Sequence, residues 1–142
     1  MDAWSLFLTA HAVLVAEVEA RLAAAGLPPL AWYDALWALE RAEGQRLRLS
    51  EFERWMVISR SNITRLVDRL QDAGLVERER SAEDGRGAYA VLTAEGRRMR
   101  RRMWTVYGPA IDERFAAPLG AAAEPLAEAM RRLIDAHRAA AG

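Results

Sequence analysis

Apolar residues recur at helical spacing from the N-terminus of the chain. The steps between them are three and four residues, and the resulting stripe is narrow enough to resemble the seam between two packed helices. Its members are Trp4, Leu8, His11, Val15, Val18 and Leu22. Gly26 and the following Pro28-Pro29 end the pattern. We therefore expect a first helix that packs against another helix.

Two later stretches also carry one apolar face. The pattern predicts a second helix from about Ala31 to Glu43, which Gly44 ends, and a last helix from about Glu124 to Arg138. The apolar positions are Trp32, Ala35, Leu36 and Leu39 in the second helix, and Leu126, Met130, Leu133 and Ile134 in the last. Both faces are expected to be buried.

A short helix is predicted after residues 46–49, where arginine and leucine alternate as in an extended segment. Ser50 and Glu53 have the spacing of a capping box, in which each side chain accepts a hydrogen bond from the other residue's amide. The helix that they start is brief, because residues 57–59 have the pattern of a turn.

The next helix is predicted to begin at Ser59, a residue type favoured as an N-cap. Its apolar residues lie at one face of a helix, and they are Ile63, Leu66, Val67 and Leu70. Gly74 stands where a left-handed residue commonly ends a helix. Two helices joined by a tight turn form a helix-turn-helix.

A β-hairpin follows directly. Val76–Arg80 and Ala88–Leu92 are strand candidates around a glycine-containing turn. Thr93 then opens a long helix through the arginine-rich residues 97–102, with a kink expected at Gly108-Pro109. The fold class is mainly α with a small β-hairpin, in one domain over residues 1–142.

Composition narrows the classes of protein that are possible. A chain of 142 residues with 52% hydrophobic residues is long enough for one domain with a real core. The absence of cysteine excludes disulfides and thiolate metal sites, and two histidines make a zinc site improbable. We expect no cofactor. No signal peptide and no apolar run long enough to span a bilayer is visible, so a soluble cytoplasmic protein is expected.

Charge is distributed unevenly although the net charge is zero. Residues 44–103 hold 14 arginines and 9 acidic residues, a net charge of +5, and the remainder carries −5. All 20 basic residues are arginine, which suits contacts to phosphate and guanine but also follows from codon bias. A basic central block with acidic flanks is compatible with a nucleic-acid-binding segment in the middle of the chain.

The predicted second helix of the helix-turn-helix has a polar outward face. At about 100° per residue, Ser61, Thr64, Arg65 and Asp68 point away from the apolar side. In a recognition helix, Arg65 could pair with guanine, Thr64 could contact a thymine methyl group, and Asn62 could reach adenine or phosphate. The alternative is an ordinary solvated helix face.

Arginines also mark the hairpin. Arg78 and Arg80 lie on its first strand, and Arg86 stands at the tip between two glycines. A narrow minor groove attracts such an arginine because its potential is strongly negative. Asp84 could hold the guanidinium of Arg86 in place. Directly behind a helix-turn-helix, the hairpin has the place of a wing.

Three aromatic or titratable side chains have two possible roles. His11 lies on the apolar stripe of the first helix. We expect it to be a buried, hydrogen-bonded structural residue, and the alternative is that it contacts a ligand. Trp32 and Tyr33 open the second helix, where aromatic residues more often belong to the core. The arginines of residues 97–102 are expected to form a solvated helix face.

Residues 49–96 resemble the winged-helix core of the MarR family of bacterial transcriptional regulators. The matching runs are SRSNITRLVDRLQDAGLVERE, EDGRGAYAVLT and the LTAEG entry to the next helix. The run LAWYDALWALE is similar to the family's second helix, and the terminal helices are similar to its dimerisation region. Three positions depart from the family pattern: Gly85 replaces a common arginine, Val57 a common glycine, and Glu53 a small residue.

The resemblance implies a division of the chain and a set of partners. Residues 1–26 and 108–142 would be dimerisation helices, and residues 30–103 the winged-helix core with the start of a long connecting helix. The protein would be a homodimer on a pseudo-palindromic operator, usually a repressor that a small phenolic or anionic effector releases. His11, Trp32 and Tyr33 are candidates for the effector pocket.

The functional hypothesis is therefore a sequence-specific DNA-binding transcriptional regulator, not an enzyme. The predicted DNA-contacting residues are Ser50, Ser59, Arg60, Ser61, Asn62, Thr64, Arg65, Arg78, Arg80, Asp84 and Arg86. An enzyme is disfavoured because no nucleophile–base constellation and no phosphate-binding loop is present. The alternative is a winged-helix module that binds proteins and has no specific affinity for DNA.

Overall fold

The computed structural model describes residues 2–57, 62–80 and 88–142. Most of the described chain is helical. The helices are α1 (Ala3–Ala24), α2 (Leu30–Arg41), α3 (Phe52–Trp55), α4 (Ile63–Asp72), α5 (Ala94–Ile111), α6 (Ala117–Leu119) and α7 (Ala123–Ala141). Short 3-10 turns occupy Glu43–Gln45, Leu49–Glu51 and Gly120–Ala122, and a π-helical turn occupies Asp112–Ala116.

In the described part of the chain, three short strands form an antiparallel sheet. They are β1 (Arg46–Arg48), β2 (Val76–Arg80) and β3 (Ala88–Leu92), in the order β1-β3-β2. Leu47 of β1 pairs with Ala90 of β3, which in turn pairs with Arg78 of β2. The sequence analysis predicted both hairpin strands with these bounds and the extended segment at β1, and the structure confirms them.

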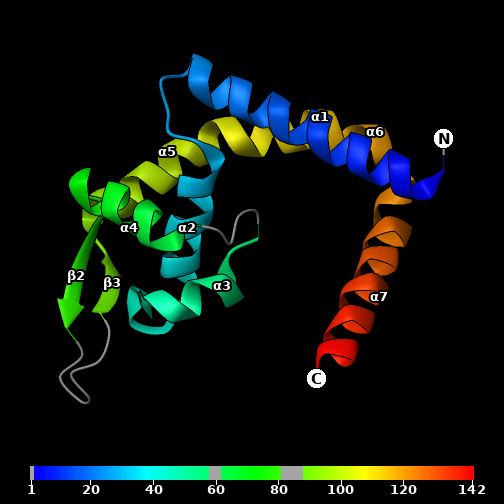
Figure 1. Cartoon of the computed structure of the whole chain (residues 1–142). Helices are drawn as coiled ribbons and strands as arrows, with labels where there is room; N and C mark the ends of the chain where they lie inside the picture. The colour runs from blue at the N-terminus through cyan, green and yellow to red at the C-terminus, as the bar shows by residue number, and fades with distance from the viewer. Residues whose placement is uncertain (1, 58–61, 81–87) are drawn as a thin grey trace.

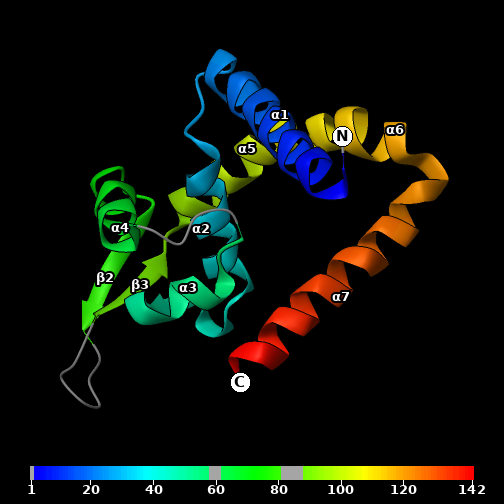
Figure 2. The same cartoon turned by 45° about the vertical axis from the view of Figure 1, so that its right-hand side comes forward.

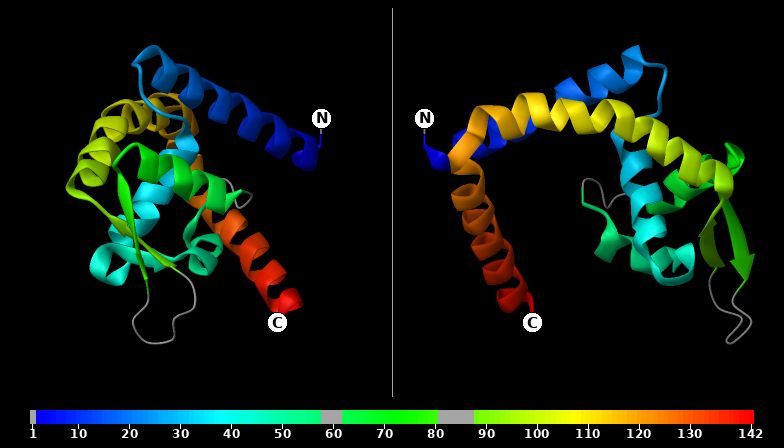
Figure 3. Two further views of the ribbon diagram at one scale, coloured as in Figure 1. Left: turned by 60° about the vertical axis from the view of Figure 1, so that its left-hand side comes forward. Right: turned by 180° about the vertical axis from the view of Figure 1, so that it is seen from behind.

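The molecule has two parts that the long helix α5 joins (Figure 1). The sheet and helices α2, α3 and α4 lie at one end of α5, and α1 crosses its other end. At the far end of α5 the chain turns through α6, and α7 runs back from there at a sharp angle (Figure 3). This arrangement confirms the predicted mainly helical winged helix-turn-helix.

The winged-helix part has its own hydrophobic core around α2. Leu36 and Leu39 of α2, Phe52 of α3, and Val67 and Leu70 of α4 are fully buried. These are the apolar positions at helical spacing in each element, so the predicted buried faces of α2 and α4 are confirmed. A second cluster joins α1 and α2 to α5, and its buried members are Val18, Leu22, Leu30, Tyr33, Met103 and Ala110.

A close contact between backbones joins the start of α5 to the end of α4. The Thr93 side chain caps α5, because its Oγ1 accepts a hydrogen bond from the Gly96 amide at 3.0 Å and donates one to the Gly74 carbonyl at 2.8 Å. Gly74 ends α4 with φ +75°, as predicted. A Cβ atom on Gly96 would lie 2.2 Å from the Leu75 carbonyl oxygen, so the approach requires glycine there.

Two predicted helix starts are wrong. The helical turn before α3 begins at Leu49, and the Glu51 side chain accepts a hydrogen bond from the Arg48 amide at 3.0 Å. The capping box predicted at Ser50 and Glu53 is therefore displaced by two residues. Helix α4 begins at Ile63, and Asn62 is its N-cap in a left-handed conformation. An N-cap at Ser59 would require Asn62 to be helical, so the predicted start is too early.

The irregularity expected at Gly108-Pro109 lies slightly further along. Helix α5 contains Pro109 and continues to Ile111, after which the π-helical turn Asp112–Ala116 follows. Prolines and π-turns are both places where helices bend. The backbone stays helical through α6 and is interrupted at Gly120, which has φ +52°, so the sharp turn lies between α6 and α7.

The apolar faces of the terminal helices are largely exposed in the single chain. Trp4 of α1 is 67% exposed, and Leu133 and Ile134 of α7 are 63% and 49% exposed. Helix α7 is present as predicted, but the prediction that its apolar face lies inside is wrong for one chain, since no residue of α7 is buried. His11 is also exposed, so the prediction that it is a buried structural residue is wrong as well.

Among the described residues, no helix is both long enough and apolar enough to cross a membrane.

Candidate nucleic-acid interface

Helix α4 presents a polar outer face. Leu66, Val67 and Leu70 anchor it in the winged-helix core, while Thr64, Arg65 and Asp68 are exposed. The anchoring face fixes the rotation of the helix, so the exposed side chains are held outward. The structure thus places Thr64, Arg65 and Asp68 as the helical periodicity predicted.

Two arginines of α4 border a shallow hollow beside the start of α2. Arg65 and Arg69 share it with Asn62 and with Trp32 of α2, and its volume is about 230 Å³. Asn62 is exposed and has φ +57°, a conformation that asparagine tolerates better than most residues. This side of α4 therefore combines an amide at the N-cap and two guanidinium groups on one accessible surface.

Arg78 holds the hairpin against α4. Its guanidinium donates a hydrogen bond to Gln71 Oε1 at 3.0 Å and forms an ion pair with Asp68. This side chain thus connects β2 to the outer edge of α4. In the structure, Arg78 therefore joins the predicted wing to the predicted recognition helix.

The remaining predicted contacts fall into two groups. Ser50 and Arg80 are exposed, Ser50 in the turn before α3 and Arg80 at the end of β2. Ser59, Arg60, Ser61, Asp84 and Arg86 lie outside the described residues.

Two arginines on the outer face of the sheet were missed by the sequence analysis. Both contact the ring of Tyr89, since the guanidinium carbons of Arg46 and Arg48 lie 4.2 and 5.2 Å from its centroid. Arg48 Nε donates a hydrogen bond to the Tyr89 hydroxyl at 3.0 Å. The alternation of arginine and leucine at residues 46–49 was the available signal, since it places both arginines on one face of β1.

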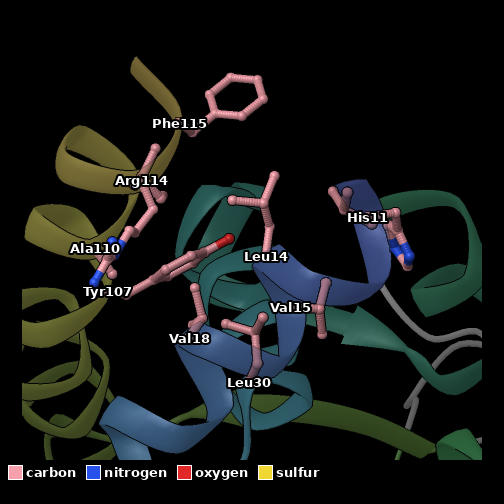
Figure 4. A pocket seen from close by; sticks show the side chains of 11 residues that line it. His11, Leu14, Val15, Val18, Leu30, Tyr107, Ala110, Arg114 and Phe115 are labelled. Atoms are coloured by element: carbon pink, nitrogen blue, oxygen red, sulfur yellow. The ribbon is translucent and has the colours of Figure 1, made fainter. Parts of the chain in front are cut away.

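A pocket of about 380 Å³ lies between α1 and α5. Figure 4 shows Leu14 and Val18 of α1 opposite Tyr107 of α5. His11 and Arg114 are its polar side chains together with the Tyr107 hydroxyl. The lining is otherwise apolar, so the pocket suits a ligand with an apolar body.

A second pocket of about 410 Å³ adjoins the first and shares Tyr107 with it. Tyr33, Trp104 and Tyr107 form an aromatic cluster there, with ring centroids 5.0 to 5.9 Å apart. Burial raises the pKa of both Tyr33 and Tyr107 above the usual value of tyrosine. The sequence analysis did not identify Trp104 and Tyr107, although their spacing of three residues on a predicted helix was the available signal.

The three predicted effector residues do not share one pocket. His11 lines the first pocket and Tyr33 the second, whereas Trp32 lies in the hollow beside α4. Consecutive residues of a helix point about 100° apart, so Trp32 and Tyr33 face different neighbours. The structure therefore does not bring the three side chains together in one pocket, and their role in effector binding stays a prediction.

The buried carboxylate of Asp34 lines the second pocket and binds the backbone of Val57. Asp34 of α2 is 4% exposed, and its Oδ2 accepts a hydrogen bond from the Val57 amide at 2.7 Å. Both residues line the second pocket. Arg100 lines it too, and pairs with Glu40 at 2.9 Å, with both side chains mostly buried. Nothing in the sequence pattern distinguished these residues, because the contacts join distant positions.

Within the described ranges, no three histidine, cysteine or acidic side chains are grouped as a metal site.

Comparison with known proteins identifies the family. The family model described as MarR family matches residues 25–87, which run from the end of α1 to the hairpin. AbsC, a MarR family transcriptional regulator from Streptomyces coelicolor, is 30% identical to the chain. The alignment covers 91% of this chain and 92% of AbsC, with a TM-score of 0.71. The chain belongs to the MarR family.

Other relatives of this MarR-family chain are known in structure or in function. Sco3205, a MarR family regulator from Streptomyces coelicolor solved in complex with DNA, is 28% identical over 94% of this chain and 84% of that one, with a TM-score of 0.85. The HTH-type transcriptional regulator PrsX of Escherichia coli is 41% identical over 64 residues. FarR of Neisseria gonorrhoeae, also described as an HTH-type transcriptional regulator, is 33% identical over 86 residues.

The matches with these curated regulators span only part of their length. They cover 39% of PrsX and 56% of FarR, and 45% and 59% of this MarR-family chain. The resemblance that the sequence motifs indicated is confirmed at the level of family and fold.

Proposed function

We propose that this MarR-family protein binds a pseudo-palindromic DNA operator as a homodimer and regulates transcription in the cytoplasm. In this proposal it acts by binding and not by catalysis. The single observation that carries it is the exposed face of α4, where Thr64 and Arg65 stand outward over a fully buried anchoring face. Recognition helices read base edges in the major groove with such N-terminal side chains. The DNA-bound structure of Sco3205 supports the same use of the fold.

The residues divide into base contacts and backbone contacts. Arg65 would read a base edge, and Asn62 and Thr64 would assist it from the same end of α4. Arg80 and the exposed turn at Ser50 would contact phosphates, which position the protein on the duplex. The proposed DNA contacts of Ser59, Arg60 and Ser61, and of Arg86 with Asp84 in the minor groove, rest on the sequence alone.

DNA binding should weaken steeply as salt is added. Each phosphate that the protein neutralises contributes a slope of about −0.9 to the dependence of log affinity on log salt. With roughly six contacts, raising salt from about 50 to 200 mM should lower affinity about 10³-fold. Selection of bound duplexes from a random pool would supply the DNA for this titration. Failure to retain any duplex at low salt would favour the alternative of a protein-binding module.

We further propose that the protein is a repressor and that a small aromatic or anionic effector releases it. The two adjoining pockets support this, because they lie between α1, α2 and α5 and contact Val57 just before the segment that leads to α4. The duplex selection repeated with aromatic acids present tests it. If none of the acids changes the recovery of DNA, the effector part of the proposal is wrong.

Dimerisation is assigned to residues 1–26 and 108–142, and residues 30–103 form the DNA-binding core and the start of the connecting helix. The exposed apolar side chains of α1 and α7 support this division, since large apolar patches on a surface mark interaction sites. Two cores in one dimer would face successive major grooves, about 34 Å apart.

Replacing Leu133 with glutamate should weaken the dimer by at least about tenfold, because a charge would enter an apolar contact. Sedimentation at a series of protein concentrations measures the change. Ala139→Glu, on the same exposed helix but outside its large apolar residues, is the control and should leave association unchanged. A dimer of unaltered strength in Leu133→Glu would place the interface elsewhere.

A further inference from the structure

Helix α2 binds the backbone at the end of α3 at two points. Figure 2 shows α3 lying across the lower part of α2. Arg41 Nη2 donates a hydrogen bond to the Trp55 carbonyl at 3.1 Å, and Asp34 Oδ2 accepts one from the Val57 amide at 2.7 Å. Asp34 and Arg41 are seven residues apart, so they lie on one face of α2 about two turns from each other. We call these two hydrogen bonds the α2 clamp.

The first helix of the helix-turn-helix is too short to fix its own direction. Helix α3 contains four residues, Phe52–Trp55, and isolated helices of this length do not form in water. The buried side chains of Phe52 and Met56 hold its two ends in the core, but the side chain of Val57 is 78% exposed. The hydrogen bond from Asp34 to the backbone therefore holds the chain where it leaves α3.

Asp34 is costly to bury, which indicates a specific role. Its side chain is 4% exposed, and among the buried side chains of the described residues it alone is charged. The next two positions of α2, Ala35 and Leu36, are fully buried and apolar. A buried carboxylate costs free energy unless it is hydrogen-bonded, and an apolar side chain of similar size would avoid that cost. The charge-assisted bond to Val57 restricts the direction of the backbone, which apolar packing does less strictly.

The other bond of the clamp comes from an arginine that aromatic rings hold in place. The guanidinium carbon of Arg41 lies 5.5 Å from the centroid of the Trp55 ring and 5.6 Å from that of the Trp37 ring. The Trp55 carbonyl belongs to the last turn of α3, where carbonyls have no partner within the helix. Helix α2 thus supplies a donor for a carbonyl and an acceptor for an amide at the end of α3.

We propose that Asp34 is a positioning residue for DNA binding and acts through the α2 clamp. Val57 lies five residues before Asn62, which is the N-cap of α4 and a proposed DNA contact. With Val57 held by Asp34 and α4 anchored in the core, the direction from α3 to α4 is set before DNA binds. Releasing Val57 would give the backbone freedom that binding then has to remove. The inference rests on the proposed function, since DNA binding is what would use this order.

Amide hydrogen exchange of the free protein tests the clamp without DNA. The Val57 amide should exchange at least about tenfold more slowly than an unstructured amide, although its side chain is exposed. In Asp34→Ala this protection should be lost, while the amide of Leu70 in the core of α4 stays protected. A Val57 amide that is unprotected in the unaltered chain would show that the bond does not form, and the proposal would be wrong.

Removing the carboxylate of Asp34 should weaken specific DNA binding selectively. Asp34→Ala should lower the affinity for the selected duplex about tenfold or more, and leave that for a scrambled duplex within about threefold. Charge alone predicts the reverse, because loss of an acidic side chain strengthens the attraction to phosphate. Glu53→Ala removes an exposed carboxylate from α3, and as the charge control it should not weaken binding.

Val57→Pro removes the same hydrogen bond from its other end. Proline lacks the amide donor, and Met56 already has the extended conformation, with ψ 139°, that the residue before a proline needs. Val57→Ala keeps the amide and is the control. If Asp34 and Val57 act through one bond, the double variant Asp34→Ala with Val57→Pro should bind the selected duplex as tightly as the weaker single variant, within about twofold.

The results separate this inference from the proposed function. If the unaltered chain retains no duplex, the proposed function is wrong and the role of Asp34 in DNA binding falls with it. If the unaltered chain binds the selected duplex and Asp34→Ala binds it equally well, only the positioning role is wrong. Losses that add in the double variant, or equal losses on selected and scrambled duplexes, would show that Asp34 serves stability alone. Thermal unfolding shows which variants are folded, and Val57→Pro carries the binding test if Asp34→Ala is not.

Discussion

Replacing Gly96 with alanine is expected to lower the free energy of unfolding by about 3 kcal/mol. The added Cβ would lie 2.2 Å from the Leu75 carbonyl oxygen and 2.6 Å from Leu92 Cδ1. The first of these atoms is backbone between α4 and β2, so it cannot rotate away as the end of a side chain could. The start of α5 must then separate from the sheet, and the Thr93 cap with its bond to Gly74 would be disturbed. Thermal unfolding should show a melting temperature lower by roughly 10 °C.

Gly108→Ala in the same helix is the matched control for Gly96→Ala. Its Cβ would meet the Trp104 ring at 2.9 Å, but that ring is a side chain and 45% exposed, so it can move. The gain in helix propensity from glycine to alanine, about 1 kcal/mol, would offset part of the cost. Gly108→Ala should therefore change stability much less. Equal effects of the two substitutions would show that the contact at Gly96 is not what limits the packing.

Arg65→Ala is expected to weaken specific DNA binding by about 1 to 3 kcal/mol and to relax the preference for one base pair in each half-site. Arg65 is exposed on α4 and takes no part in the buried face, so folding should be unaffected. Binding to the selected duplex and to single-base variants of it measures both effects. The expected loss comes from a bidentate contact to a guanine edge.

Two results would distinguish base recognition from a backbone contact. Arg65→Lys keeps the positive charge but lacks the two-pronged geometry of the guanidinium. Compared with Arg65→Ala, it should therefore bind DNA more tightly in general but should not regain the base preference. A loss in Arg65→Ala that is uniform across all duplexes would show that Arg65 contacts only phosphate. Arg101→Ala, on an exposed part of α5, is the control and should leave base preference unchanged.

The secondary structure was largely predictable from local patterns. The apolar spacing at Leu66, Val67 and Leu70 predicted both the existence and the buried face of α4, and Gly74 predicted its end. The errors lie at helix starts and at the terminal helices. The observed cap joins Glu51 to the Arg48 amide, and arginine is not a residue type typical of an N-cap, so the sequence pattern did not indicate it. On α7 the apolar stripe indicated burial, but the described residues leave Leu133 63% exposed.

The sequence predicted the parts of the candidate interface that lie within one helix or strand, but not the contacts between different elements. Periodicity along α4 placed Thr64 and Arg65 outward, and both are exposed. The brace from Arg78 to Asp68 joins β2 to α4, and the contact of Asp34 with Val57 joins α2 to the segment after α3. The spacing of residues along the chain predicts neither contact, because each depends on how two separate elements pack against each other.

By itself the sequence determined which segments are helices and strands, the buried faces of α2 and α4, and the motifs that place the chain in the MarR family. Those features are local: a helix repeats every 3.6 residues and a strand every two, so a short window of sequence is enough to reveal them. Only the tertiary structure decided which distant side chains share a cavity, as Tyr33 and Tyr107 do, and which backbone Gly96 approaches. Such contacts follow from the packing of whole elements against one another, and that packing is set by the shapes of both partners at once.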